Sequence, residues 1–506
     1  MDTGDTGDTG DTGTIADLLS RAARQWPDAV AVIDTAAGVS LTWAQLDAAA
    51  DGLVARLTAE GTGPGDRVVL RLPTSADFAV TLFGVTRAGA IAVPVSPTAP
   101  RPELDTVLAH SGAGLVVSRV PEDGTPDVPV LRPEIGSGES APAVGGGEDI
   151  AVLSYTSGTT GPPRGVMLSH RALLANLAQL GRLDPEPVRH EDRVLIAIPL
   201  FHVYGLGPGL LLSTSAGATL VLAERFDARQ AMRTCADHRI TVIGGVPAMY
   251  SELAELDRDE LAAGLATVRL LTSGAAPLHP KVLAAIRDKA GLAVYEGYGL
   301  TESAPVVTST LVTGYAKPGS AGRPLPGVEI RLVGPDGTDE AVPLDPDDPD
   351  DVFTEDGDGT GLVAIRGANL FSGYWPDGAH GPGPDGWFRT GDVGFLDSDG
   401  DLHLVDRAND LVIVNGFNVF PHEVEEVIAQ LPGVAEAAVV GVLDERSGEA
   451  VKAVVVPAPG AALSEQQVVA HCAARLAGYK VPHVVEFAER LPHSPTGKLR
   501  RVRLRG

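Results

Sequence analysis

Residues 154–166 read SYTSGTTGPPRGV, a run of small hydroxyl residues and glycines in a short space. Gly158 and Gly161 allow backbone angles that side chains forbid, so successive N–H groups can converge on one point. Such a loop fits an anion with many oxygens, and a polyphosphate is the obvious candidate. The same residue types also form ordinary polar turns, and the spacing is not that of a Walker A loop. The rest of the chain must decide between these interpretations.

Length and composition indicate a globular protein with more than one core. The chain has 506 residues and a hydrophobic content of 44%, and at about 150 residues per domain it would form two to four units. Its net charge of −27 argues against a general binder of nucleic acid or anionic membranes. Cys235 and Cys472 lack metal-ligand spacing, so we expect neither a disulfide framework nor a zinc site. A reducing cytoplasm fits this cysteine usage.

The sequence predicts neither a signal peptide nor a membrane span. Residues 1–14 repeat Asp-Thr-Gly and lack basic and apolar blocks, so we expect a disordered acidic tail. The stretch LGPGLLLSTSAGATLVLA, which starts at residue 206, is interrupted by Gly, Pro and hydroxyl residues. No apolar run approaches the roughly eighteen residues of a membrane helix. We therefore expect a soluble cytoplasmic protein without integral membrane association.

Apolar stretches of strand length alternate with Ala- and Leu-rich helical windows over residues 15–299, for example VAVI at 30–33 and RVVLRL at 66–71. This alternation predicts βα units and parallel sheets, and hence an α/β fold. Residues 319–406 instead carry many Gly-Asp turns, which are typical of short antiparallel strands. After the Asp-Arg pair at 406–407 the pattern predicts a small α+β domain. The expected domains are an N-terminal domain at 15–406 and a C-terminal domain at 407–506.

Seven blocks, in order along the chain, resemble the adenylate-forming superfamily. They are SYTSGTTGPPRGVMLSH (154–170), PLFHVYG (199–205), LLTSGAAPL (270–278), YEGYGLTES (295–303), WFRTGDVG (387–394), DRANDLVIVNGFNVFPHEVEEV (406–427) and SPTGKLRR (494–501). Within the superfamily the chain most resembles fatty acyl-CoA and related acyl-CoA ligases, over nearly everything after the tail. These enzymes activate a carboxylic acid with ATP to an acyl-adenylate and pyrophosphate. They then transfer the acyl group to the thiol of CoA.

The resemblance also implies an architecture. It is a large N-terminal domain of two helix-flanked β-sheets plus a small β-barrel-like subdomain. A small mobile α+β domain follows, and it swings about a hinge between the two half-reactions. The hinge position usually carries Asp or Lys, and Asn409 stands there. We expect that the loss of an ion pair at this position changes how the two conformations are populated and weakens one half-reaction.

By resemblance, a first set of residues binds the phosphates. Those that would wrap the β- and γ-phosphates and later pyrophosphate are Thr156, Ser157, Gly158, Thr159, Thr160 and Gly161. Arg164 stands where Lys is usual, and because the charge is kept we expect its phosphate contact to persist. Thr301 and Glu302 would lie beside the α-phosphate, with Glu302 on Mg²⁺, a hard cation that prefers carboxylate oxygen. Alone, Glu302 would be an ordinary exposed loop acid.

A second set, also implied by the resemblance, binds the nucleoside and CoA. Those that would surround adenine are Tyr298 and Gly299 on one side and Ser273, Gly274 and Ala275 on the other. Asp392 would accept hydrogen bonds from the ribose hydroxyls, with support from Arg407. Gly416 would let the pantetheine of CoA pass close to the backbone, next to Phe417. The CoA phosphates would meet Arg475, Lys480, Arg500 and Arg501, unless these form only a solvated basic tail.

Lysine usage singles out one further residue. Of the 39 basic residues, the lysines are Lys281, Lys289, Lys317, Lys452, Lys480 and Lys498. Lys498 nevertheless stands beside the arginine-rich run RRVRLR. A compact, flexible ammonium suits a migrating catalytic cation that reaches both the substrate carboxylate and the α-phosphate. We therefore predict that Lys498 is catalytic rather than an ordinary surface lysine.

The acid pocket is predicted from two apolar segments. His202, in PLFHVYG, matches the gate at the acyl end of the family's pocket, although a lone His in an apolar run is more often a satisfied core residue. The other expected lining residues are Val203, Val246, Met249 and Tyr250. The flexible sulfur of Met249 and its apolar neighbours imply a hydrophobic acyl group.

Three hypotheses about function remain open at this point. The first is a complete ATP-dependent, AMP-forming acid-thiol ligase that uses ATP, Mg²⁺ and CoA on a hydrophobic carboxylic acid. The second is a partial or redirected ligase, which performs mainly one half-reaction or loads the thiol of an acyl carrier protein. The third is a non-catalytic adenylate-binding module, which the presence of Glu302, Asp392 and Lys498 disfavours. The sequence does not identify the acid.

Overall fold

The computed structural model describes residues 13–99, 101–119, 128–156, 164–333, 361–407, 412–414, 417–419, 421–444, 448–476, 478–493, 499 and 501–504. The chain packs as two compact units. The larger unit comprises Met1–Gly319, Pro324–Glu329 and Arg366–Phe388, and the smaller unit comprises the remaining residues. Residues 389–406 therefore pack with the smaller unit. That a mobile C-terminal domain begins at residue 407 stays a prediction.

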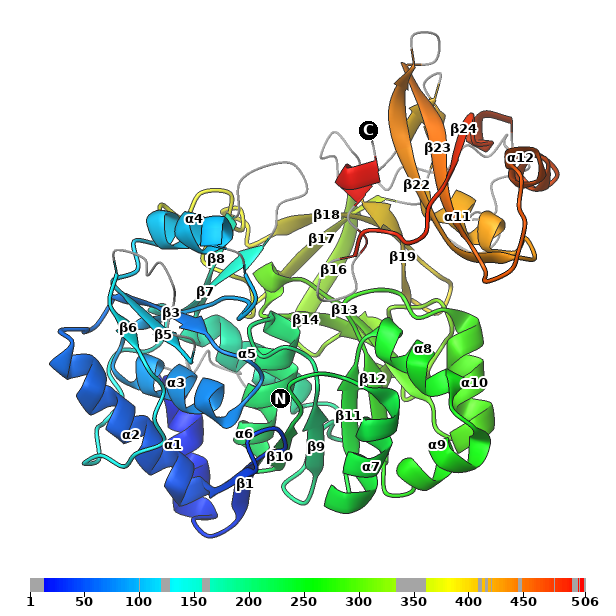
Figure 1. Ribbon diagram of the computed structural model, residues 1–506. Helices are drawn as coiled ribbons and strands as arrows, with labels where there is room; N and C mark the ends of the chain where they lie inside the picture. The colour runs from blue at the N-terminus through cyan, green and yellow to red at the C-terminus, as the bar shows by residue number, and fades with distance from the viewer. Residues whose placement is uncertain are drawn as a thin grey trace, which may run out of the picture. The chain divides into compact units, whose positions relative to one another are not determined.

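The larger unit contains a six-stranded sheet (Figure 1). Its strands, in spatial order, are β6 (Val130–Leu131), β5 (Leu115–Ser118), β3 (Arg67–Arg71), β4 (Ile91–Pro94), β7 (Ile150–Thr156) and β8 (Arg164–Ser169). The first five run parallel, whereas β8 turns back antiparallel to β7. The buried side chains of Val69, Val93 and Leu153 form part of one apolar core here. The near-continuous apolar composition of β3, β4 and β5 is typical of parallel strands buried on both faces.

A nine-stranded sheet forms the second layer of the larger unit. Its order is β15 (Arg323–Pro324), β14 (Val306–Ser309), β13 (Val294–Gly299), β12 (Leu270–Ser273), β11 (Val242–Gly245), β9 (Arg193–Ile196), β10 (Thr219–Leu222), β1 (Val30–Asp34) and β2 (Val39–Thr42). The strands from β13 to β1 are parallel, whereas β2 and β14 pair antiparallel with their neighbours. The carboxyl ends of the parallel strands therefore meet along one edge, where open α/β sheets bind ligands.

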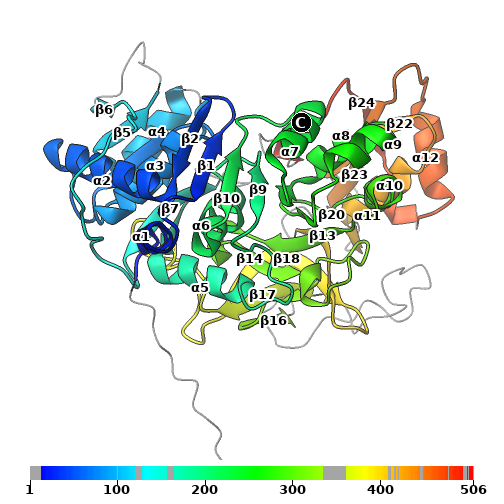
Figure 2. The ribbon, with the colours of Figure 1, turned by 90° about the horizontal axis from the view of Figure 1, so that it is seen from below.

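Helices cover these sheets. They are α1 (Ala16–Gln25), α2 (Trp43–Ala59), α3 (Ala76–Arg87), α4 (Arg101–Ser111), α5 (His170–Leu180), α6 (Leu212–Ala216), α7 (Ala228–His238), α8 (Pro247–Glu255), α9 (Arg258–Gly264) and α10 (Pro280–Ala290). Figures 1 and 2 show α2 and α3 beside the six-stranded sheet and α7 to α10 beside the nine-stranded one. Short polar residues begin several helices, because their side chains accept the otherwise unpaired N–H groups of the first turn. Thr42, Ser75, Ser169 and Asp227 act in this way.

The apolar stretch that starts at residue 206 folds into a π-helix, η1 (Gly205–Leu211), followed by the short helix α6. Pro208 lies inside η1, and π-helical turns are rare in proteins and are frequently found at functional sites. Among the described residues, no helix is both long enough and apolar enough to cross a membrane.

The smaller unit contains most of a four-stranded sheet and a separate five-stranded sheet. The first consists of β16 (Val328–Val333), β17 (Gly361–Gly367), β18 (Phe388–Leu396) and β19 (Leu402–Arg407). The second consists of β21 (Phe417–Val419), β20 (Val412–Val414), β23 (Gly448–Pro457), β22 (Val434–Asp444) and β24 (Val484–Phe487). Helices α11 (Pro421–Ala429) and α12 (Glu465–Ala473) pack on its apolar core. The predicted α/β architecture, with antiparallel strands after residue 319, is confirmed.

Candidate active site

The predicted phosphate loop connects the two strands of the β7–β8 hairpin. Thr156 is paired with Arg164 at the end of the ladder where this loop joins the two strands. Ser157, Gly158, Thr159, Thr160 and Gly161 lie outside the described residues, so their role stays a prediction. The side chain of Arg164 is exposed and can meet an anion at this end of the hairpin.

The free edge of β8 pairs with residues 371–375, more than two hundred residues further along the chain. Val166 and Tyr374 form an antiparallel bridge. The backbone N–H of Ser372 donates to Met167 O at 2.9 Å, and that of Trp375 donates to Gly165 O at 2.8 Å. Strand β8 is therefore hydrogen-bonded to β7 on one side and to residues 371–375 on the other.

The turn that carries Thr301 and Glu302 meets the same segment. Both residues are half-buried in η2 (Thr301–Ser303), directly after β13 and Leu300. The backbone N–H of Phe371 donates to Glu302 O at 2.9 Å, and Asn369 Nδ2 donates to Ser303 O at 2.7 Å. The structure thus brings Glu302 to the hairpin through residues 369–371.

Tyr374 joins Glu302 to Arg164. Its hydroxyl donates to Glu302 Oε1 at 2.7 Å, and Arg164 Cζ lies 5.5 Å from the centroid of its ring. Burial and then the Glu302 charge raise the pKa of Tyr374, so the phenol stays protonated and remains a donor at neutral pH. The sequence analysis missed Tyr374, because only a pairing between distant segments places it here.

The predicted adenine-binding residues lie at the ends of two neighbouring parallel strands. Ser273 ends β12 and pairs with Glu296 of β13. Ala275 follows with a φ of 72°, a left-handed conformation that is uncommon for a residue with a side chain. Tyr298 is buried near the end of β13. Their common edge fits a ligand at the carboxyl ends of the strands.

Two glycines in these segments allow close packing. A Cβ atom at Gly299 would lie 2.0 Å from Pro305 O, a contact that no side chain could make without moving the backbone. A Cβ atom at Gly274 would lie 3.3 Å from ring atoms of Tyr204. The predicted adenine-binding wall therefore depends on the absence of side chains at both positions.

A buried carboxyl group supports the same wall. Glu296 is only 8% exposed, and its Oε2 accepts a hydrogen bond from Leu278 N at 2.9 Å. Its Oε1 is buried and has no hydrogen-bond partner among the described residues. Burial raises the pKa of Glu296 to about 7, and the bond from Leu278 lowers it only in part. Glu296 lies inside the motif YEGYGLTES, but the sequence analysis assigned it no role.

The predicted acid-pocket residues lie on the segments after β9 and β11. His202 Nδ1 accepts from the N–H of Tyr204 at 3.2 Å, so the neutral imidazole carries its proton on Nε2. Val203 and Met249 are buried. Met249 forms an apolar cluster with Ala197, Ile198, Tyr204, Ala223, Phe226 and Val246.

Tyr250 is completely buried, and its hydroxyl donates to Thr272 O at 2.7 Å. This bond ties α8 to β12. Burial raises the pKa of Tyr250 well above its ordinary value. The hydroxyl thus has a structural use, whereas a contact of this ring with the acid stays a prediction.

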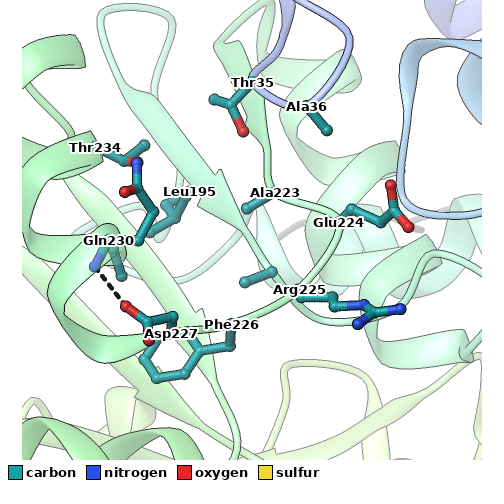
Figure 3. Close-up of a pocket in the computed structure, with 12 residues that line it drawn as sticks. Thr35, Ala36, Leu195, Ala223, Glu224, Arg225, Phe226, Asp227, Gln230 and Thr234 are labelled. Carbon is teal, nitrogen blue, oxygen red and sulfur yellow. Dashed lines mark hydrogen bonds between the residues drawn. The ribbon is translucent and has the colours of Figure 1, made fainter.

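A cavity of about 470 Å³ opens beside the apolar cluster (Figure 3). It lies at the carboxyl ends of β1, β9 and β10 and at the first turns of α7, whose Asp227 side chain accepts from Gln230 N at 2.8 Å. Ala197, Ala223 and Phe226 belong to both the cavity wall and the apolar cluster. No predicted nucleotide-binding residue lines it.

In the smaller unit, strands β18 and β19 pair Asp392 with Arg407. Asp392 is 8% exposed, and its N–H donates to Thr390 Oγ1 at 3.1 Å. The register thus places the two predicted ribose-binding residues side by side. Lys498, Asn409, Gly416 and Arg500 lie outside the described residues; Phe417 lies in β21, but its side chain is not described.

Two of the basic residues expected on the CoA phosphates have other partners. Lys480 is buried, and its Nζ lies 3.0 Å from Glu423 Oε1. Arg501 donates to both carboxylate oxygens of Glu425, at 2.9 and 2.8 Å. Any CoA phosphate would have to compete with these ion pairs, and a phosphate role for these two residues stays a prediction. Arg475 is exposed, and its role stays a prediction.

Comparison with known proteins assigns both parts of the chain. The family described as "AMP-binding enzyme" matches residues 19–375, and the one described as "AMP-binding enzyme C-terminal domain" matches residues 423–498. A feruloyl-CoA synthase from an Amycolatopsis species is 37% identical over 95% of this chain and 96% of its own length. The long-chain-fatty-acid–CoA ligase FadD13 of Mycobacterium tuberculosis is 35% identical over 96% of this chain and 97% of its own.

Solved structures agree with this assignment. ATP-bound MatB from Rhodopseudomonas palustris superposes with a TM-score of 0.85 at 31% identity, over 97% of this chain and 98% of that one. The o-succinylbenzoate CoA synthetase MenE from Bacillus subtilis, in complex with its acyl-adenylate intermediate, gives 0.83 at 28% identity over the same shares. The chain therefore belongs to the AMP-binding enzyme family, within the adenylate-forming superfamily, and is an AMP-forming ligase of the acyl-CoA ligase type.

Proposed function

We propose that this protein activates a hydrophobic carboxylic acid with ATP to an acyl-adenylate and transfers the acyl group to CoA, releasing pyrophosphate and AMP. The observation that carries the proposal is the cluster of Arg164, Tyr374 and Glu302 at the loop end of the β7–β8 hairpin. It combines a cation for phosphate oxygens with a carboxylate for a metal ion. Both are needed where charge builds on a reacting phosphate.

Glu302 fits a Mg²⁺ ligand. Its Oε1 is held by a neutral phenol, and Oε2 has no partner among the residues that the structure describes. The neutral phenol brings no positive charge next to the carboxylate, and carboxylate oxygen is the ligand that a hard cation prefers. A bound Mg²⁺ would neutralise part of the charge on the phosphate oxygens.

The remaining site residues take the roles that the family motifs assign. Residues 156–161 would wrap the β- and γ-phosphates, and Thr301 would donate to the α-phosphate. Ser273, Gly274, Ala275, Tyr298 and Gly299 would bind adenine, and Asp392 with Arg407 would bind ribose. Lys498 would supply the cation for adenylation. Gly416 and Phe417 would border the pantetheine in thioester formation, and Asn409 would serve as the hinge.

The apolar cluster around Met249 supports a hydrophobic acyl group. Its side chains, together with Val203, Val246 and Tyr250, would enclose the acid, and His202 would close the end near the adenylate. The curated relatives are named for ferulate, 4-coumarate and long-chain fatty acids, which share an apolar body behind one carboxylate. They give the carrier-protein alternative no support. We place the reaction in the cytoplasm, which suits the free, buried Cys235 and Cys472.

The test is a panel of acids with the purified full chain. Ferulate, 4-coumarate, fatty acids of increasing length, o-succinylbenzoate and, as a polar control, malonate are each incubated with ATP, Mg²⁺ and CoA. We expect equimolar AMP, pyrophosphate and an acyl-CoA of the matching mass with at least one apolar acid. Turnover of malonate alone would refute the hydrophobic pocket. Release of pyrophosphate from none of the acids would refute the proposed function.

A further inference from the structure

We propose that Tyr374 is a positioning residue for adenylation, which fixes the carboxylate of Glu302 and the guanidinium of Arg164 relative to each other. The inference rests on the proposed function, because it gives these two groups their metal and phosphate roles. It concerns a residue outside the seven motif blocks. The physical basis is a contact between three segments that the sequence keeps far apart.

The ring of Tyr374 has little freedom to turn. The bridge to Val166 fixes its backbone, and the buried ring of Phe371 packs against it edge-on, with centroids 5.0 Å apart at 71°. The guanidinium of Arg164 lies near the ring at 5.5 Å. The hydroxyl can therefore meet Glu302 Oε1 at 2.7 Å without a further loss of rotamer freedom.

A phenol suits this position better than a cation would. A neutral O–H group orients one carboxylate oxygen but leaves the negative charge of Glu302 for a metal ion. A Lys or Arg in its place would neutralise the carboxylate and compete with the metal. Tyr374 thus orients the carboxylate of Glu302 without bringing a positive charge next to it.

The ring also suits an arginine at position 164. A planar guanidinium stacks on an aromatic face, whereas the compact ammonium of a lysine has no planar face to stack. Arg164, which departs from the family's usual Lys, therefore matches Tyr374. The ring of Tyr374 would hold the guanidinium of Arg164 in one position beside the hairpin.

Two substitutions separate the hydroxyl from the ring. Tyr374→Phe keeps the ring near Arg164 and the packing on Phe371, but it removes the hydroxyl, and with it the bond to Glu302 and the interaction of the phenol oxygen with Arg164. Tyr374→Leu removes the ring as well. The matched control is Tyr295→Phe, which deletes a phenol that donates to Gly314 O at 3.3 Å, away from the cluster.

Calorimetry measures the affinity for ATP in the presence of Mg²⁺ and in the presence of a chelator. The ratio of the two affinities shows how well Glu302 is placed to bind the metal ion. In the wild type we expect Mg²⁺ to strengthen ATP binding. In Tyr374→Phe this gain should fall by about tenfold or more, the order expected for one lost hydrogen bond to a charged group, while metal-free ATP binding should change much less. Tyr295→Phe should match the wild type. Equal gains in the wild type and Tyr374→Phe, or no gain in the wild type, would overturn the inference.

A double-variant comparison distinguishes positioning from a loss of fold. If Tyr374 acts through Glu302, then Glu302→Gln and the double variant Glu302→Gln, Tyr374→Phe should lose the same amount of pyrophosphate release, because the second change has nothing left to remove. Additive losses would overturn the inference. If the wild type adenylates no acid, the proposed function fails, and the calorimetric comparison still decides the role of Tyr374.

Discussion

Replacement of Glu296 by Gln should change how the stability of the larger unit depends on pH. Glu296 is 8% exposed, and one of its oxygens is buried without a partner among the described residues. Gln keeps the shape and the acceptor for Leu278 N but cannot ionise. The substitution therefore isolates the free energy of burying the charged carboxylate.

The sign follows from the raised pKa. Unfolded, the carboxyl group titrates near 4.5, and folded it titrates near 7. Between these pH values the folded chain holds a proton on Glu296 that the unfolded chain has lost. The contribution of Glu296 to the free energy of unfolding therefore falls as pH rises from 4.5 to 7 and then stays level. The difference between the two pKa values corresponds to about 3 kcal/mol. The Gln variant avoids this loss.

Urea unfolding at a series of pH values measures the effect. All four tryptophans, Trp26, Trp43, Trp375 and Trp387, lie in the larger unit, so their fluorescence reports on it. We expect the free energy of unfolding of Glu296→Gln, minus that of the wild type, to rise by about 3 kcal/mol between pH 4.5 and 7. All other titrations cancel in this difference.

A difference in free energy of unfolding that is the same at every pH does not test the argument, because the new amide N–H group costs about 1–3 kcal/mol at every pH if it stays unpaired. The test is the change of this difference with pH. A difference that does not change between pH 4.5 and 7 would show that Glu296 ionises normally in the folded chain, and the argument from its burial would be wrong.

Three further predictions concern other parts of the chain. Lys498→Ala should reduce adenylation by roughly 100- to 1,000-fold, as for one lost oxyanion donor, but should reduce CoA capture from a supplied acyl-adenylate much less; equal losses would contradict the assigned role. Lys480→Met should destabilise the smaller unit by about 3–5 kcal/mol because it removes the ion pair that Lys480 makes with the buried carboxylate of Glu423, and Glu423→Leu added to it should restore most of the loss in a thermal melt. Gly299→Ala should abolish ATP binding and lower the melting temperature, since the new Cβ would collide with Pro305 O; unchanged calorimetry would refute that clash.

The sequence located strands well where both faces are buried. The apolar runs at 30–33 and 66–71 correspond to β1 and β3 within one residue at either end. Such runs are continuous because neighbours cover both sides of a parallel strand. The order of strands could not be read, since β9 lies between β10 and β11 through pairings between distant segments.

The site was predictable only where its chemistry is written in local motifs. Glu302 and Arg164 each stand in a recognisable motif block. Tyr374 lies 72 residues from Glu302, and it contacts Glu302 because residues 371–375 pair with the free edge of β8. Likewise, the buried partner of Lys480 is on α11, 57 residues earlier, so the lysine could not be told from a solvated basic tail. A local sequence motif shows which chemical group a residue carries. Burial and ion pairing in the folded chain decide whether that group can contact a ligand.

The ladder register of the hairpin has a consequence for how tightly ATP is held. Because Thr156 and Arg164 face each other, the seven residues between them must start and finish at neighbouring points. A segment with pinned ends gives up less chain entropy when it closes around an anion than one with loose ends. If the hairpin loop binds ATP as proposed, weakening the bonds between β8 and residues 371–375 should therefore lower nucleotide affinity.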